Sequence, residues 1–380
     1  MRNNLLPFVV ILFLAIFQSG FSDEPVDLYS DGLRVSSPEK IVTVWDDLTD
    51  GLQTAEDWPA RREKLKREYL ALIADEAKPP KPPLDLTWEE AVDVEGIYTR
   101  HKITYNVEAD ERATAFLGIP NAPVTDAEGN PVKFPAVVAL HGTTAMGMSQ
   151  TAGLCGNPTK AHLDHLCRMG FVVIAPEHFV AENRIPAEGA YDTTAFHRKH
   201  PNWTAVGKFN YEHSIAVDIL ETLEQVDSAR IGVVGHSLGG HGAYFLAAYD
   251  ERIAAAASNC GMGSFRQTDT VKNWARNEWY VYFQTMREPL AEGKLPNIDH
   301  HEIMALIAPR PLLDVSALND GDPLAQRQRV LMLMKVMDLY DLLGASDAFS
   351  FYIHGRGHSI ETESRALIYT WLKEKLAVRQ

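Results

Sequence analysis

Apolar and polar residues follow two patterns along this chain: strict alternation, and later apolar runs separated by helix-length stretches. Together these patterns predict a sheet covered by helices. Between residues 92 and 119, apolar side chains alternate with polar ones, as in the antiparallel start of a sheet. Beyond a turn at 126–131, apolar runs of strand length recur with helix-length stretches between them. We expect strands at 135–140, 170–176, 231–234, 253–257, 311–317 and 349–354. Alternating strands and helices imply a mostly parallel, twisted sheet with helices on both faces, which is an α/β fold.

A helical segment precedes the predicted sheet. Asp57-Trp58-Pro59 is typical of a helix start, and apolar residues follow at helical spacing: Leu65, Tyr69, Leu72 and Ile73. A proline-rich run at 78–83 ends this helix. Residues 23–90 offer too little apolar surface for a separate core, so we expect them to pack on the outside of a main domain at 91–380. Two insertions, at about 177–210 and 259–304, are expected to form a cap on that domain.

The first 22 residues predict export. Met1–Asn4 is short and basic, and the apolar run Leu5–Phe17 is shorter than the roughly 20 residues that a spanning helix needs. We therefore expect a signal peptide at 1–22 and a secreted or periplasmic protein, with an uncleaved anchor as the alternative. No other apolar run approaches spanning length, so no stable membrane span is expected after cleavage.

Charge, cysteine and histidine content narrow the classes of partner. The formal net charge of −15 argues against nucleic acid and against anionic membrane surfaces. Three cysteines are too few for a disulfide framework, and whether Cys155 and Cys167 pair is left open. The densest histidine cluster, Asp299–Glu302, matches no metal motif and is expected to be solvated. We predict no metal and no cofactor.

Gly235-His236-Ser237-Leu238-Gly239-Gly240 carries the chemistry. The motif stands between the β-branched strand 231–234 and a small, apolar helical stretch at 241–249. Strand, sharp turn and helix form the setting of a G-x-S-x-G nucleophile elbow. The strained turn leaves room only for small residues two positions before and after the serine, and Gly235 and Gly239 are suitable. We predict that Ser237 is a nucleophile.

A serine hydroxyl needs a base, and the base needs an acid to orient it. In the α/β-hydrolase order of serine, acid and histidine, the histidine follows the last strand. His358 lies in the flexible loop after 349–354, and we favour it over His354 at the strand end. Asp320 follows the strand 311–317 by a few residues, and we assign it as the acid, with Asp322 as the alternative.

The oxyanion of a tetrahedral intermediate also needs hydrogen-bond donors. The backbone N–H of Leu238, directly after the nucleophile, is the first predicted donor. Thr143 is the second, since the His141-Gly142 pair after the strand 135–140 can turn backbone amides inward. The alternative is that His141-Gly142 only ends that strand.

These motifs resemble the α/β-hydrolases of the dienelactone hydrolase and acetyl xylan esterase-like group. The resemblance covers about residues 92–378 and rests on the His141-Gly142 loop, 170–176, the elbow at 235–240, 308–313 and Gly357-His358. The elbow departs from the cysteine-containing elbow of true dienelactone hydrolases. It also lacks the Gly-Cys-Ser elbow of glucuronoyl esterases, which argues against both of those specific activities.

The sequence thus predicts an exported serine esterase, and the resemblance implies short-chain (acetyl) esters of carbohydrates as substrates. We expect substrate contacts from His141, Gly142, Trp274 and Trp279, the two tryptophans lying in the aromatic-rich insertion. Two alternatives remain: a peptidase of the prolyl oligopeptidase clan, and a non-catalytic binding protein on a hydrolase fold. The natural substrate and the oligomeric state cannot be inferred from the sequence.

Overall fold

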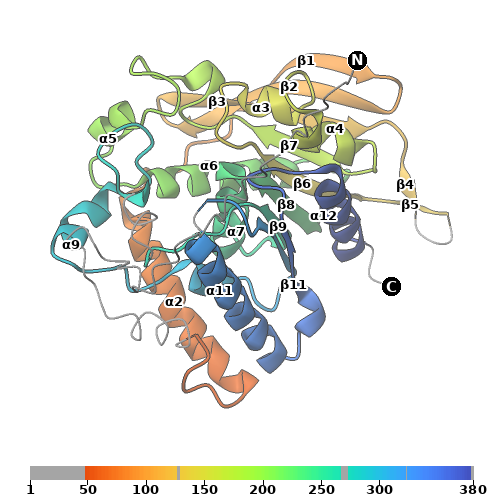
Figure 1. Cartoon of the computed structure of the whole chain (residues 1–380). Helices are drawn as coiled ribbons and strands as arrows, with labels where there is room; N and C mark the ends of the chain where they lie inside the picture. The colour runs from red at the N-terminus through yellow and green to blue at the C-terminus, as the bar shows by residue number, and fades with distance from the viewer. Residues whose placement is uncertain (1–47, 126–128, 267–272, 322, 378–380) are drawn as a thin grey trace, which may run out of the picture.

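A nine-stranded mixed sheet forms the centre of the molecule (Figure 1). The computed structural model describes residues 48–125, 129–266, 273–321 and 323–377. The strand order is β1-β2-β3-β7-β6-β8-β9-β10-β11. The strands are β1 (Thr87–Val94), β2 (Tyr98–Glu108), β3 (Glu111–Pro120), β6 (Phe134–Leu140), β7 (Val172–Pro176), β8 (Val226–His236), β9 (Ile253–Asn259), β10 (Leu312–Ala317) and β11 (Phe349–His354), with β4 (Val124–Thr125) and β5 (Pro131–Val132) paired separately.

The mode of strand pairing changes once across this sheet, from antiparallel to parallel. β1, β2, β3 and β7 pair antiparallel in turn, and every pair from β7 to β11 is parallel. The predicted α/β fold with an antiparallel start is therefore confirmed. The carboxyl ends of the parallel strands share one edge, where ligands bind in open α/β sheets.

Helices cover both faces of the sheet, as predicted. In the part of the chain that the structure describes, the α-helices are α2 (Trp58–Leu72), α3 (Gly147–Thr151), α4 (His162–Cys167), α5 (Thr194–Lys199), α6 (Ala205–Glu221), α7 (Leu238–Tyr249), α9 (Arg287–Ala291), α10 (His300–Ala305), α11 (Pro323–Leu342) and α12 (Thr362–Lys375). Alternate residues of β6 show the two faces. Val138 belongs to the core under α6 and α7, while Val137 belongs to the core under α4 and α12. Burial on both faces explains why this strand is wholly apolar.

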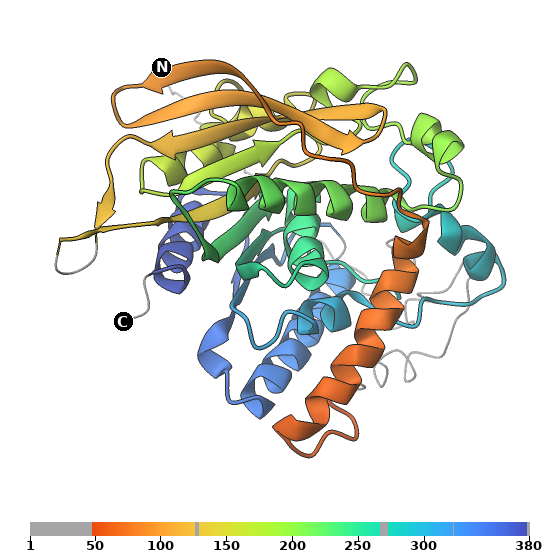
Figure 2. The same cartoon turned by 180° about the vertical axis from the view of Figure 1, so that it is seen from behind.

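The N-terminal helix α2 packs along the outside of the α/β core, as Figure 2 shows for the red helix. The Tyr69 hydroxyl donates to the carbonyl of Phe245 at 2.8 Å, and Arg62 donates to the carbonyl of Leu306 at 3.1 Å. β1 starts at Thr87, so the sheet begins inside the segment 23–90 that was assigned to the extension. The hydrophobic pattern did not predict β1, because β1 is an exposed edge strand without an apolar face.

The structure also bears on the predicted signal peptide, the two cysteines and the histidine cluster. Residues 1–22, the predicted signal peptide, lie outside the described part, in which no helix is long and apolar enough to cross a bilayer. Cys155 and Cys167 are free thiols, the first exposed and the second buried in α4. The Asp299–Glu302 cluster was expected to be solvated, and that was wrong. Asp299 caps α10, and its carboxylate accepts hydrogen bonds from Ser264 and Phe265, which bury the cluster.

Candidate active site

Ser237 occupies a sharp turn between β8 and α7. Its backbone has φ 59° and ψ −118°, a strained conformation for a residue with a side chain. A Cβ at Gly235 would collide with the backbone of Gly239, and one at Gly239 would collide with the carbonyl of Leu140. Glycines two residues away on both sides are thus required by close backbone approach, and the turn has the geometry of a nucleophile elbow.

Ser237, His358 and Asp320 form a continuous hydrogen-bonded row. The Ser237 hydroxyl donates to His358 Nε2 at 2.8 Å, and His358 Nδ1 donates to Asp320 Oδ2 at 2.7 Å. The three residues come from the elbow, the loop after β11 and the loop after β10. His358 keeps 47% of its side chain exposed, so the row opens to solvent. Its order and contacts are those of a serine hydrolase triad.

Asp320 is held as a carboxylate. Burial alone would raise its pKa, but the hydrogen bond from His358 and the nearby charges of His358 and Arg329 lower the pKa below its ordinary value. Asp314 differs, because burial within β10 raises its pKa to about 7, and its partner is the Ser316 hydroxyl at 2.6 Å. Asp322, the alternative acid, lies outside the described residues.

His354 has a local structural role. At the buried end of β11, its Nδ1 accepts a hydrogen bond from the backbone N–H of Arg356 at 3.2 Å, and its carbonyl accepts one from Leu318 at 2.8 Å. These contacts join the two loops that carry Asp320 and His358. Of the two histidines, the structure places His358 within hydrogen-bond distance of Ser237.

His236 and Asn259 support the elbow, and no sequence pattern pairs these two residues. His236 Nδ1 donates to Asn259 Oδ1 at 2.5 Å, and the Asn259 carbonyl accepts the backbone N–H of Ser237 at 2.8 Å. Burial lowers the pKa of His236 to about 3, so the ring is neutral. Together they hold the elbow against β9, the next strand along the chain.

The loop after β6 lies directly against the nucleophile. A Cβ on Gly142 would stand 3.4 Å from Ser237 Cβ and 3.0 Å from the His236 carbonyl oxygen, so only glycine fits without displacement. Thr143 follows as an exposed residue, and Leu238 opens α7, where backbone N–H groups are free of intrahelical partners. The two predicted oxyanion donors therefore belong to segments that meet at Ser237.

The Tyr191 hydroxyl contacts the backbone of the loop after β6 on both sides of Thr143. The sequence did not predict this role. The buried hydroxyl lies 2.9 Å from the Thr144 carbonyl and 3.1 Å from the Gly142 carbonyl, and it accepts the Thr144 N–H at 3.0 Å. These contacts bracket Thr143 on both sides. Tyr191 lies in the predicted insertion 177–210, but nothing in its local sequence distinguishes it from the other aromatic residues there.

Tyr191→Phe is expected to lower kcat about 10- to 100-fold with little change in KM. The ring and its packing remain, while the Thr143 amide loses its fixed direction. The effect should be smaller than the roughly 10²- to 10³-fold loss from removing a donor outright. Steady-state kinetics on a small ester measures it. Tyr280→Phe is the matched control, since Tyr280 bonds His178 at 2.9 Å in the same aromatic cluster. Equal kinetic losses in both variants would contradict the role given to Tyr191.

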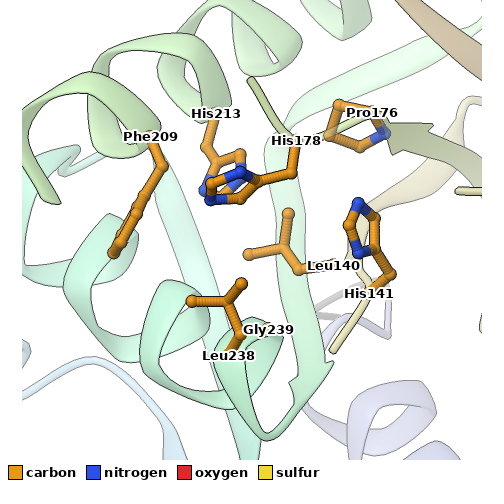
Figure 3. A pocket seen from close by; sticks show the side chains of 8 residues that line it. All are labelled: Leu140, His141, Pro176, His178, Phe209, His213, Leu238 and Gly239. Atoms are coloured by element: carbon orange, nitrogen blue, oxygen red, sulfur yellow. The ribbon is translucent and has the colours of Figure 1, made fainter. Parts of the chain in front are cut away.

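A small cavity lies behind the loop that follows β6 and carries Gly142 and Thr143 (Figure 3). Its volume is about 10 Å³, room for one water molecule at most, so it is not an acyl pocket. Burial lowers the pKa of His141 to about 4 and that of His213 to about 3, and it lowers the pKa of His178 as well. The lining residues are Leu140, His141, Pro176, His178, Phe209, His213, Leu238 and Gly239.

The His141 ring does not occupy the position expected of a substrate contact. The buried imidazole lines the cavity behind the loop, and its Nδ1 donates to the Gly142 carbonyl at 2.9 Å. A residue directly after a buried strand can face inward, and burial of this neutral ring supports the loop from behind. The structure therefore leaves Gly142, but not the His141 ring, at the face beside Ser237.

The two tryptophans assigned to substrate binding differ in exposure. Trp274 is 4% exposed and packs against His241 at 4.9 Å and Tyr282 at 4.4 Å between ring centroids. It has no free face for a sugar ring. Trp279 is 42% exposed, its indole N–H donates to the Ala190 carbonyl at 3.1 Å, and the Arg276 guanidinium lies over the ring. The expectation of stacking applies only to Trp279.

Comparisons with known sequences match parts of this chain. A family model described as glucuronyl esterase of fungi matches residues 187–344, fewer than half of the chain. "Putative hydrolase YtaP" of Bacillus subtilis (strain 168) is 26% identical over 220 residues, 56% of this chain and 69% of the relative. "Carbohydrate esterase MZ0003", from an unknown prokaryotic organism, is 34% identical over 132 residues, 32% of this chain and 30% of that protein.

Solved structures show the same fold. The glucuronoyl esterase from Solibacter usitatus has a TM-score of 0.68 at 18% identity, over 85% of this chain and 94% of that one. A "putative acetyl xylan esterase (BF1801)" from Bacteroides fragilis NCTC 9343 has a TM-score of 0.63 at 16% identity, over 89% and 95%. At such low identity the likeness shows the fold alone, which is that of the α/β-hydrolases.

Proposed function

We propose that this protein is a serine hydrolase of carboxylic esters. The observation that carries the proposal is the row from the Ser237 hydroxyl through His358 to the Asp320 carboxylate, at 2.8 and 2.7 Å. His358 Nε2 takes the hydroxyl proton as Ser237 attacks the ester carbonyl. The N–H groups of Leu238 and Thr143 stabilise the oxyanion.

The same imidazole serves in both halves of the reaction. His358 gives its proton to the departing alcohol, which leaves an acyl group on Ser237. Water then attacks the acyl-enzyme, with His358 again accepting a proton, and the acid leaves. No step in this sequence requires a metal or an organic cofactor.

For the substrate, we propose an ester of a carbohydrate, with a glucuronoyl ester as the first candidate. The family model over residues 187–344 and the 34% identity to a carbohydrate esterase support this choice. The absence of Gly-Cys-Ser at the elbow argued against this activity, but His236 fills the preceding position as a buried neutral group whose Nδ1 is bonded to Asn259. Acetyl esters are the second candidate, which the acetyl xylan esterase-like resemblance of the motifs supports.

A panel with matched leaving groups tests these candidates. Benzyl glucuronate should give a higher kcat/KM than benzyl acetate if the glucuronoyl group is recognised, and Ser237→Ala should hydrolyse neither. The reverse order would favour acetyl esters. Turnover of a matched anilide at a rate comparable to that of the ester would overturn the esterase proposal in favour of a peptidase.

Acyl length gives a further prediction for the p-nitrophenyl esters. If acetyl esters are the substrates, we expect kcat/KM to fall steadily from acetate through butyrate to octanoate, because an acyl site shaped for acetate has no room for added methylenes. A lipase would instead gain about 0.8 kcal/mol for each methylene that it buries. A maximum at butyrate would leave a general carboxylesterase, and one at octanoate would contradict a carbohydrate substrate.

We also propose that the enzyme acts outside the cytoplasm. The support is the apolar run Leu5–Phe17 behind a basic start. An enzyme outside the cytoplasm would reach a polymeric carbohydrate substrate that does not enter the cell.

A further inference from the structure

Cys260 stands beside the acid and the base of the triad. The Cys260 sulfur, a carboxylate oxygen of Asp320 and a ring nitrogen of His358 all lie within 4.8 Å of one another. Thiolate, imidazole and carboxylate are the three ligand types that Zn²⁺ takes in proteins. The proposed reaction uses Asp320 and His358 but gives no role to this sulfur.

The backbone fixes the position of Cys260. Its φ is 50°, in the left-handed region, and its N–H donates to the Val315 carbonyl at 2.7 Å. The thiol lies 3.6 Å from the carbonyl of Ser359, the residue after His358. The thiol is therefore held in a defined place against the loop that carries the base.

Only small side-chain movements separate this cluster from a tetrahedral metal site. Zn–S bonds of about 2.3 Å and Zn–N and Zn–O bonds of about 2.0–2.1 Å place ligand atoms roughly 3.3–3.5 Å apart. The His358–Asp320 pair already lies at 2.7 Å and need only open slightly. Three protein ligands would leave a fourth position for water.

Nearby charges set the strength of such a site. Burial and the carboxylates of Asp320 and Asp314 raise the pKa of the Cys260 thiol to about 12, and these carboxylates would favour a cation. Arg329 and Lys160 also lie close enough to interact with Cys260 and would oppose a cation. The balance favours a reversible site over a permanent one.

We propose that Cys260, Asp320 and His358 bind a thiophilic divalent cation such as Zn²⁺, and that its binding switches off ester hydrolysis. Cys260 loses its thiol proton to solvent and binds as thiolate, and His358 binds through the lone pair of its neutral ring. Nε2 serves Ser237 and Nδ1 serves Asp320, so coordination at either nitrogen breaks the row. The site is inhibitory, and the metal takes no part in catalysis.

The inhibition rests on the proposed function, but metal binding does not, so the test measures both. Calorimetric titration of Zn²⁺ into Ser237→Ala, which keeps all three ligands, measures binding without turnover. The same titration into Ser237→Ala/Cys260→Ala removes the sulfur. In parallel, Zn²⁺ inhibition of ester hydrolysis is measured in wild type, Cys260→Ala and Cys155→Ala, each relative to its own metal-free rate. Cys155 is the matched control because its thiol is exposed.

We expect one Zn²⁺ per chain in Ser237→Ala, bound at least about tenfold more weakly once Cys260 is removed. Wild type and Cys155→Ala should be inhibited alike, with Cys260→Ala resistant by a similar factor. Equal inhibition of all three proteins, or no Zn²⁺ bound by folded Ser237→Ala, would overturn the proposal. Cys260→Ser provides a second variant if the alanine protein does not fold. Binding without any ester hydrolysis in wild type would instead contradict the proposed function alone.

Discussion

Ser237→Ala and His358→Ala are each expected to abolish almost all ester turnover. Ser237 supplies the atom that forms the acyl bond, and His358 is the base within 2.8 Å of it. A nucleophile without its base is as ineffective as a base without its nucleophile. The double variant should therefore be no slower than either single variant, because residues that act as one unit are strongly non-additive.

Single-turnover and steady-state rates on a small ester measure this effect. His354→Ala is the control for the histidine, since it removes an imidazole from the adjacent strand end without touching Ser237. A near-complete loss in His354→Ala with activity retained in His358→Ala would contradict the assignment. Full multiplication of the two single losses in the double variant would show that Ser237 and His358 act independently.

Asp320→Asn is expected to lower kcat by about 10⁴-fold, by analogy with the same change in serine proteases. An amide at this position would present N–H to His358 and favour the tautomer with its proton on Nε2. That nitrogen could then not accept the Ser237 proton. The fold should survive, because the side chain keeps its size and is half-buried in a loop.

Asp322→Asn is the matched control and should cost much less, acting through loop stability. Kinetics of both variants, with thermal unfolding as a check on folding, decide between the two acids. Equal losses would leave the acid unassigned, and the reverse order would transfer the role to Asp322.

The order and type of the core elements could be predicted from sequence because buried parallel strands are nearly uniform apolar runs. The runs at 135–140 and 311–317 correspond to the buried strands β6 and β10 within a residue. β1 escaped prediction for the opposite reason. It is an exposed edge strand whose Glu89 and Glu90 remove the apolar alternation.

The site residues likewise fall into those that a local sequence pattern predicts and those that it does not. Ser237, His358 and Asp320 could be selected because each follows a recognisable strand, and their catalytic roles remain predictions. Tyr191, Asn259 and Cys260 could not, because they reach the site through tertiary contacts that leave no local pattern. The direction of the His141 ring and the burial of Trp274 likewise depend on packing between segments distant in sequence.

Covalent labelling of the nucleophile tests the central claim most directly. A fluorophosphonate probe should add once to the wild-type chain, and peptide mass spectrometry should place the adduct on Ser237. Ser237→Ala should take up no probe, and His358→Ala should react far more slowly, because the base that activates the hydroxyl is gone. An unlabelled wild-type protein, or an adduct on another residue that persists in Ser237→Ala, would contradict the account.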